Sequence, residues 1–493
     1  MLLIMTDQQR FDTIRCLGND LVHTPNFDRL VARGTAFQNA YSTCPVCVPA
    51  RYTIRSGCEP TRTDIWDNTV PPNRHDQIAE EVGPYLAVAM AERGYRTFGV
   101  GKFHTAPWDA AVGFEDHLHS EEFYETPEQR AGDAYACWIA TEHLEHDWVE
   151  ALMGERTEMY YMPQMSPLPA ALTVESWAAD RAVELIERDD DRPWFGHVSF
   201  IGPHPPFAPP LPFHRMYDPD RMPLPVLGDL EVDHLDQHLP WMNHMVFADD
   251  VDDDRARALK ARYYGEISYI DGCLGRILDA VDRRPDPDNV LIIFASDHGD
   301  LLGDHHGWQK ESFFEAATRI PFLLSWPRQL PQRGTSADLV CLTDVFGIAT
   351  TAAGYPDLRQ GHDVIGVLRD GVAPREVLFG YHGRPGTRRF KAMVRHDRYK
   401  LIWLANGGHR LLFDVVDDPS ELRPIQLERP ELVDRLQGLL VEQLRAERVD
   451  AVLDGDGLRS EPYSEWERRR IYQFDRSRGV TGFPREPATV IPG

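Results

Sequence analysis

Long apolar runs and an excess of positive charge are both missing from this chain of 493 residues. No stretch approaches the roughly 20 consecutive apolar residues that a transmembrane helix requires, so we expect no membrane partner. The formal net charge of −26 disfavours nucleic acid and anionic membranes, because like charges repel. An anionic small molecule would have to be bound by a local cluster of positive side chains.

Lysine is scarce, because arginine supplies most of the 52 basic residues. The lysines are Lys102, Lys260, Lys310, Lys391 and Lys400. In a lysine-rich protein each would first be interpreted as a surface residue. Here a lysine beside other polar residues is a candidate functional group, and this applies to Lys102, two positions before His104, and to Lys310.

The seven cysteines are an odd number and lack the spacing of a disulfide framework, which favours a reducing compartment. The chain begins on an apolar segment without the basic region and cleavage site of a signal peptide, so we expect a cytoplasmic protein. Cys44 and Cys47 could form a zinc or redox pair. A zinc site, however, would need a second Cys/His pair. In a redox motif the two cysteines would lie at the start of a helix, without a proline such as Pro49 shortly after them.

Apolar segments that alternate with helical patterns predict an α/β fold, with a doubly wound, mostly parallel sheet sandwiched by helices. The strands are expected at residues 2–5, 96–100, 193–201, 289–296 and 320–326. The helices are expected at residues 24–34, 79–93, 174–188 and 255–281. Residues 1–375 would form this α/β domain, and the irregular segments 105–172 and 205–250 would be insertions near the pocket.

The sequence pattern changes after residue 375, where four short apolar segments are separated by turns. Residues 376–448 are predicted to form a smaller antiparallel sheet covered by a helix. The tail, 449–493, carries aromatic residues among many arginines but is too short to form its own core. We expect it to pack on its own domain or on a neighbouring subunit, which suggests a dimer or tetramer.

Polar residues follow several of the predicted strands. They are Asp7 and Gln8, Lys102 and His104, His204, and Asp297 and His298. Parallel strands would bring all of them to one edge of the sheet, where α/β proteins place their sites. An aspartate after a strand is often only a helix cap. As a set, however, two carboxylates, an amide and one imidazole suit Ca²⁺, Mn²⁺ or Mg²⁺ better than zinc.

The segment Cys47-Val-Pro-Ala-Arg51, followed by Ser56-Gly57, resembles the sequence that directs oxidation of a cysteine to formylglycine in type I sulfatases. Ala50 stands where that family usually has serine. Further segments resemble sulfatase motifs in the same order, over roughly residues 1–445. They are Thr6-Asp-Gln-Gln-Arg10, Thr24-Pro-Asn-Phe-Asp28, Gly101-Lys-Phe-His104, Gly202-Pro-His204 and Ser296-Asp-His-Gly-Asp300. The family belongs to the alkaline-phosphatase superfamily, whose fold is a doubly wound sheet.

The resemblance implies that Cys47 is converted to formylglycine by a formylglycine-generating enzyme, a transient partner. It also implies one divalent cation, Ca²⁺ or Mn²⁺ with Mg²⁺ as a further option, which the modified residue 47 would help to bind. The implied protein ligands are Asp7, Gln8, Asp297 and His298. The implied catalytic groups are Arg51, Lys102, His104, His204 and Lys310. Asn68 is a candidate substrate contact.

The implied reaction cleaves an organic sulfate monoester to an alcohol and sulfate. A hydroxyl of the hydrated aldehyde would attack sulfur, and His204 or Lys310 would protonate the leaving alcohol. His104 would then take a proton as sulfate leaves. The aromatic residues of the two insertions would shape the alcohol pocket for an aryl, sugar or quaternary-ammonium group. They are Trp108, Trp148, Tyr160, Tyr161 and Trp241.

Two alternatives remain open. Gln8 and His298 resemble the branch of the family that contains choline sulfatases and phosphonate monoester or phosphodiester hydrolases. The first alternative is therefore a phosphonate monoester or phosphodiester hydrolase with the same nucleophile. Lys102 and His104 favour a sulfate ester as the substrate, because the resemblance implies that the phosphonate branch carries other residues at these two positions. A non-catalytic binding protein of the same fold would be expected to have lost some of these residues, whereas here each position holds a usable side chain.

Overall fold

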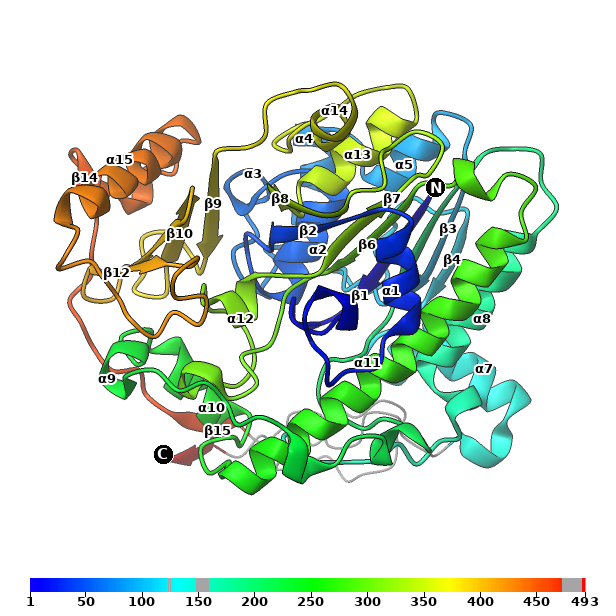
Figure 1. The fold of residues 1–493 in the computed structure, drawn as a ribbon, viewed down its shortest axis with the longest axis horizontal. Helices are drawn as coiled ribbons and strands as arrows, with labels where there is room; N and C mark the ends of the chain where they lie inside the picture. Colours follow the sequence, from blue (N-terminus) through cyan, green and yellow to red (C-terminus); the bar gives the residue numbers. More distant parts are fainter. Residues whose placement is uncertain (123, 125, 148–158, 472–489, 493) are drawn as a thin grey trace.

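The computed structural model describes residues 1–122, 124, 126–147, 159–471 and 490–492. Its centre is an eight-stranded sheet (Figure 1). Across the sheet the strands are β4 (Asp116–His119), β3 (Arg96–Gly101), β5 (Trp194–Ser199), β1 (Leu2–Thr6), β6 (Ile292–Ser296), β7 (Phe322–Ser325), β2 (Thr35–Tyr41) and β8 (Gly334–Cys341). Only β7 is antiparallel to its neighbours. The mostly parallel sheet is the one predicted from the sequence.

Strand β1 lies in the middle of the sheet, and all of its side chains are buried. Because successive side chains of a strand point to opposite faces, Leu2 and Ile4 enter one core and Leu3 and Met5 the other. Helices cover both faces (Figure 1). On one side are α1 (Pro25–Ala32), α8 (Val174–Glu187) and α11 (Asp253–Asp282). On the other are α2 (Cys47–Ser56), α5 (Leu86–Ala91) and α13 (Asp344–Ala352).

The remaining helices are short, and most lie in the connections. They are α3 (Pro60–Thr63), α4 (Arg74–Val82), α6 (Pro127–Gly132), α7 (Ala134–Glu142), α9 (Leu230–Asp233), α10 (His238–Met245), α12 (Glu315–Thr318) and α14 (Val364–Arg369). The single helix predicted over residues 79–93 is wrong. Gly83, with a φ of 99°, ends α4, and Pro84 cannot continue it, so the chain restarts as α5.

The structure also corrects the prediction for residues 105–172. This segment is not wholly an irregular insertion, because β4 pairs with β3 at the edge of the main sheet and α6 and α7 follow it. Strand β8, which pairs in parallel with β2, was not predicted at all. Both are edge strands with half-exposed side chains, so neither has the continuous apolar pattern of a central strand.

The C-terminal module matches its prediction. Strands β9 (Val377–His382), β10 (Lys391–His396), β11 (Tyr399–Leu404) and β12 (His409–Asp414) form an antiparallel sheet. Helix α15 (Pro430–Ala446) packs on one face through Leu436, Leu440 and Leu444. Two short pairs complete the described tail, β13 (Leu453–Asp454) with β14 (Gly457–Leu458) and β15 (Arg469–Ile471) with β16 (Val490–Pro492).

Part of the tail packs on its own chain. The Gln237 side chain donates to the Tyr463 hydroxyl at 3.1 Å and accepts from the Trp466 backbone N–H at 3.2 Å. Most of the tail's last residues, 472–489 and 493, lie outside the described part, so docking on a neighbouring subunit stays a prediction.

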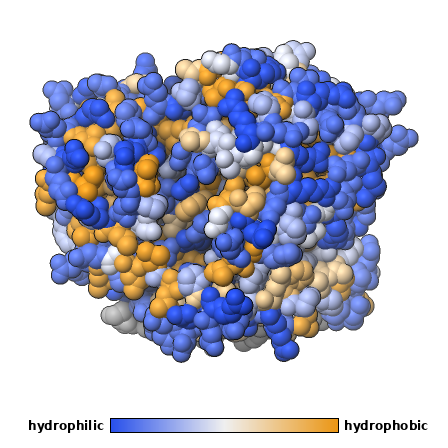
Figure 2. All heavy atoms as spheres, viewed as in Figure 1, coloured by the Kyte–Doolittle hydropathy of each residue, from blue (hydrophilic) through white to orange (hydrophobic). Residues whose placement is uncertain are grey.

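Among the described residues, no helix combines the length and apolar character needed to cross a membrane. Hydrophilic residues dominate the face seen in Figure 2.

Candidate active site

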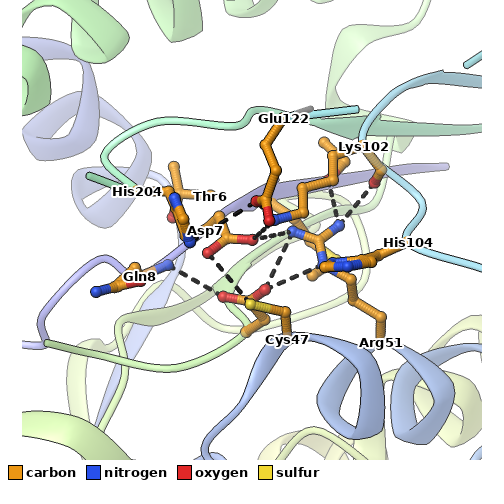
Figure 3. A network of polar contacts seen from close by, with 12 residues as sticks. Thr6, Asp7, Gln8, Cys47, Arg51, Lys102, His104, Glu122 and His204 are labelled. Carbon is orange, nitrogen blue, oxygen red and sulfur yellow. Dashed lines mark hydrogen bonds and ion pairs between the residues drawn. The ribbon is translucent and has the colours of Figure 1, made fainter. Parts of the chain in front are cut away.

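Strands β5, β1 and β6 are adjacent and in register, so their carboxyl ends are level. Met5 pairs with Ser199 and Thr6 pairs with Ser296. The segments that follow must therefore meet, and the predicted polar residues after β1, β3 and β5 come together at this edge (Figure 3). Asp297 and His298, which follow β6, lie with Asp7 in the same group. Helix α2, which carries the cysteine motif, begins at the same place.

Cys47 is the first residue of α2 and is buried. Its Sγ lies 3.0 Å from Nζ of Lys310, 3.3 Å from Nε2 of His298 and 3.8 Å from Oδ1 of Asp7. Burial and the neighbouring Asp7 raise the pKa of the Cys47 thiol to about 12, despite the nearby lysines. The unmodified residue is thus a protonated thiol at neutral pH and a poor nucleophile.

Cys44 is separate from this group. Its thiol is unpaired and buried, and it contacts the backbone carbonyl of Trp66 at 3.7 Å. The ligand atoms of Asp7, Cys47, Asp297 and His298 form the one potential metal-binding group found among the described residues, and Cys44 is not part of it. The geometry gives no support to a zinc or redox pair made of Cys44 and Cys47.

The ligand atoms of Asp7, Cys47, Asp297 and His298 all lie within 4.8 Å of one another. His298 donates from Nδ1 to the carbonyl of Gly299 at 2.9 Å, which directs Nε2 towards the group. Burial, reinforced by Asp7, raises the pKa of Asp297 to about 7. Two adjacent buried carboxylates are the arrangement that a hard divalent cation would stabilise, so this donor set fits such an ion.

Gln8 lies beside this group with a φ of 67°, a left-handed conformation that is uncommon outside glycine. Its side-chain oxygen accepts from Lys310 at 2.8 Å, and its amide nitrogen donates to Asp300 at 2.6 Å. Gln8 therefore links Lys310 to Asp300, a buried carboxylate that the sequence analysis did not assign to the site. Gln309 and Glu311, on either side of Lys310, also have positive φ angles of 80° and 67°.

Arg51 lies one helical turn after Cys47 and binds both carboxylates. Its guanidinium contacts Asp7 at 2.9 Å and Asp297 at 3.1 Å. It also donates to the carbonyl of Lys102 at 2.6 Å and to the hydroxyl of Ser199 at 2.8 Å. The planar fork of arginine suits this multiple contact. The side chain ties α2 to the ends of β1, β3, β5 and β6.

Lys102 and Glu122 form a buried ion pair at the same edge. Nζ of Lys102 lies 2.7 Å from Oδ2 of Asp7 and also contacts Oε2 of Glu122 (Figure 3). Glu122 was not predicted, because a glutamate in a polar stretch resembles a solvated charge. The signal that could have revealed it is strand β4, which ends three residues earlier and brings Glu122 to this edge.

Two histidines, His104 and His204, lie beside the Lys102–Glu122 ion pair. His204 donates from Nδ1 to the carbonyl of Pro205 at 2.7 Å, and its buried Nε2, which makes no hydrogen bond, lies 3.7 Å from Oε2 of Glu122. Burial lowers the pKa of His204 to about 3. His104 has a φ of 51°, and burial and Lys102 lower its pKa to about 4. Both imidazoles are therefore neutral at pH 7.

A cavity of about 520 Å³ is lined by Val48, the residue that follows Cys47. Its lining includes Val48, Asn68, His104, Glu122, Trp108 and Trp241. The side-chain oxygen of Asn68 accepts from the N–H of Val48 at 3.1 Å, which places this exposed amide beside residue 47. Both predicted insertions contribute walls to the cavity.

The remaining predicted pocket aromatics lie elsewhere. Tyr160 and Tyr161 are buried behind the site, where the Tyr161 hydroxyl lies 3.4 Å from Asp300. Trp148 falls outside the described residues.

Comparisons with known proteins identify the family. The family model described as "Sulfatase" matches residues 1–355, and that of the N-sulphoglucosamine sulphohydrolase C-terminal region matches residues 303–450. An arylsulfatase of Clostridium perfringens is 26% identical, with 93% of this chain and 96% of the relative covered. A choline-sulfatase of Rhizobium meliloti is 27% identical, with 94% and 90% covered.

Among solved structures, a phosphonate monoester hydrolase of Agrobacterium radiobacter has the same fold. Its TM-score is 0.73 at 24% identity, and the match covers 93% of this chain and 99% of the other. The doubly wound architecture and the resemblance inferred from the motifs are thereby confirmed. The chain belongs to the sulfatase family of hydrolases.

Proposed function

We propose that this protein hydrolyses an organic sulfate monoester to an alcohol and sulfate, with residue 47 as the nucleophile after conversion to formylglycine. The observation that carries the proposal is the position of Cys47. Its sulfur lies among Lys310, His298 and Asp7 at the edge of the sheet, yet its pKa of about 12 leaves the thiol protonated. Membership of the sulfatase family and the arylsulfatase and choline-sulfatase relatives support the sulfate ester as substrate.

Formylglycine, once hydrated, supplies a hydroxyl as nucleophile and a second hydroxyl whose deprotonation releases sulfate. The residues around it have distinct tasks. Lys102 and Lys310 offer positive charge to the oxygens of the transferred group. Burial opposes the charge of Lys310, but the carboxylate of Asp7 favours it and the pKa of Lys310 is raised, so Lys310 carries a proton at neutral pH. Of the two candidates for protonating the leaving alcohol, we therefore assign Lys310.

His204 and His104 are neutral at pH 7, and each has a buried ring nitrogen without a hydrogen bond. Because Nδ1 of His204 carries the ring proton, Nε2 is an acceptor and can take a hydrogen bond from a hydroxyl beside it, but it cannot donate to the oxygens of the transferred group. His104, which lines the cavity, can take a proton from residue 47 as sulfate leaves. Asn68 is placed to contact the substrate from the cavity side.

One divalent cation belongs to this proposal. Asp7, Asp297 and His298 would hold it, together with residue 47. The resemblance adds the amide oxygen of Gln8, which here accepts a hydrogen bond from Lys310. The cation would balance the two buried carboxylates and add positive charge beside the nucleophile. Ca²⁺, Mn²⁺ and Mg²⁺ all suit oxygen-rich ligands.

The modification must come from a partner. Cys47 is buried at the start of α2, so a formylglycine-generating enzyme would have to act on the chain before it folds. The cytoplasmic location and an oligomer of two or four chains remain predictions from cysteine usage and from the aromatic tail.

A phosphonate monoester or phosphodiester hydrolase is the second candidate, because Gln8 and His298 resemble that branch of the family. A direct comparison tests both. We expect a higher kcat/KM for 4-nitrophenyl sulfate than for the mono(4-nitrophenyl) ester of phenylphosphonate, and no turnover of either by Cys47→Ala. A preference for the phosphonate would establish the second candidate. Activity retained by a folded Cys47→Ala protein would place the nucleophile elsewhere.

A further inference from the structure

A buried carboxylate lies where an anion is expected to bind. The side chain of Glu122 is 2% exposed, pairs with Lys102 and lies 3.7 Å from Nε2 of His204. It also lines the cavity beside residue 47. Burial acts to raise the pKa of Glu122, but the ammonium group of Lys102 holds that pKa well below its usual range, so Glu122 is ionised at neutral pH.

Lys102 does not need Glu122 as a partner. Its ammonium group already contacts Asp7 at 2.7 Å. A neutral glutamine could fill the same space and accept the same hydrogen bond. What Glu122 adds is one negative charge at the wall of the cavity.

The charges at this edge fall into two groups. Asp7 and Asp297 belong to the candidate cation site, where a divalent ion would balance them. Arg51, Lys102 and Lys310 are the cationic side chains near residue 47. Among the described residues, Glu122 is the carboxylate that contacts one of these cations without belonging to the candidate cation site. It therefore lowers the net positive charge of the side chains around a bound anion by one.

We propose that Glu122 is a specificity-determining residue that fits the site to singly charged transferred groups and selects against doubly charged phosphate monoesters. The proposal rests on the proposed function, because it requires the transferred group to lie against Lys102. A sulfate monoester and a phosphonate monoester carry one negative charge at neutral pH. A phosphate monoester carries nearly two, since its second pKa is about 6.

The physical reason is electrostatic. A fixed charge a few ångströms from the oxygens of the bound group acts through a low effective dielectric constant, and its repulsion doubles when the charge of the ligand doubles. Glu122 weakens binding of every anion, but it weakens binding of the dianion most. Removing its charge without changing its shape should therefore favour the phosphate monoester.

The test uses 4-nitrophenyl sulfate and 4-nitrophenyl phosphate at pH 8, so that the leaving group is the same. We expect Glu122→Gln to raise the ratio of kcat/KM for phosphate to that for sulfate at least ten-fold. Glu122→Asp, which keeps the charge, should keep the wild-type ratio within about three-fold. Rates are normalised to formylglycine content and to folded protein.

The neighbouring residue gives a matched control. Glu121 is also buried, but its carboxylate accepts from the backbone N–H groups of Phe103 and His104 and contacts His119 at 2.6 Å rather than Lys102. Glu121 also lines the cavity but does not contact Lys102, so Glu121→Gln should shift the ratio clearly less than Glu122→Gln does. A ratio that is unchanged in Glu122→Gln, or one that moves towards sulfate, would overturn the proposal and leave Glu122 as a structural partner of Lys102.

Failure of the proposed function would look different. If the wild-type enzyme prefers the phosphonate ester to the sulfate ester, the assignment as a sulfatase fails. The role of Glu122 is then tested with the mono(4-nitrophenyl) ester of phenylphosphonate as the singly charged substrate. The same ten-fold change in the ratio is expected, because the argument depends on charge and not on the central atom.

Discussion

Nζ of Lys310 lies 3.0 Å from Sγ of Cys47, although 263 positions separate the two residues in the chain. The lysine is buried, and its other contact is the side-chain oxygen of Gln8 at 2.8 Å. Nothing else in the described structure brings a flexible proton donor so close to the sulfur. The relationship makes Lys310 the first residue to test.

Lys310→Ala should lower kcat/KM for an alkyl sulfate by about 10²–10⁴-fold, the usual contribution of general acid catalysis. The loss should be smaller for 4-nitrophenyl sulfate, whose leaving group needs little protonation. Steady-state kinetics on the two substrates measure the difference. Lys260→Ala, a change of another largely buried lysine that lies on α11, is the control and should leave kcat/KM within three-fold. Equal losses on both substrates would argue against a proton-donating role.

Residue 47 should be formylglycine in active protein. Trypsin releases residues 34–51, a peptide that contains both Cys44 and residue 47. After alkylation, mass spectrometry should find one alkyl group on Cys44 and none on residue 47, whose thiol has been replaced by an aldehyde. Ala50→Ser, which restores the residue usual in the family's motif, should keep or increase the converted fraction. Two alkylated cysteines in fully active enzyme would contradict the mechanism.

Removing divalent cations should lower both activity and the melting temperature. Asp7 and Asp297 are buried side by side, and burial with Asp7 raises the pKa of Asp297 to about 7, so a bound cation would stabilise the folded state. Dialysis against EDTA followed by Ca²⁺, Mn²⁺ or Mg²⁺ identifies the ion by calorimetric titration. Asp297→Asn should weaken that binding at least ten-fold. Equal melting temperatures with and without EDTA, together with undiminished binding by the variant, would remove the metal site.

Glu266 should make the protein less stable at alkaline pH. One of its oxygens accepts from the N–H of Ala208 at 2.9 Å, the other is buried without a hydrogen bond, and burial, with Glu175, raises its pKa well above the usual range. Because the folded pKa exceeds the unfolded value of about 4.3, stability falls as the pH rises towards and through the folded pKa.

Glu266→Gln should therefore be more stable than the wild type at pH 8, by about 1–3 kcal/mol, and should show less loss of stability between pH 5 and pH 8. Denaturant unfolding across this range measures the effect. Glu80→Gln, a change at an exposed position of α4, should leave the pH dependence of the wild type unchanged. Identical pH profiles for wild type and Glu266→Gln would show that Glu266 is not strained by burial.

Central strands were predictable because parallel strands buried on both faces need continuous apolar sequence. Leu2–Thr6 and Ile292–Ser296 fit that pattern, and polar residues follow each of them. Asp116–His119 and Gly334–Cys341 do not, because edge strands keep exposed polar side chains. The missed strand β4 also hid Glu122, since nothing local distinguishes this glutamate from a solvated one.

The sequence alone pointed to Cys47 as the candidate nucleophile and to the polar residues that reach the edge of the sheet, because a motif and the end of an apolar strand are local features. Tertiary structure decided which charges meet. Arg51 binds Asp7 and Asp297, and Lys102 lies between Asp7 and Glu122. These partners come from separate segments, and their contacts depend on the order of the strands and on the register of β1 with β5 and β6. The physical reason is that long-range ion pairs form only where the packed sheet brings side chains within a few ångströms, which no local pattern encodes.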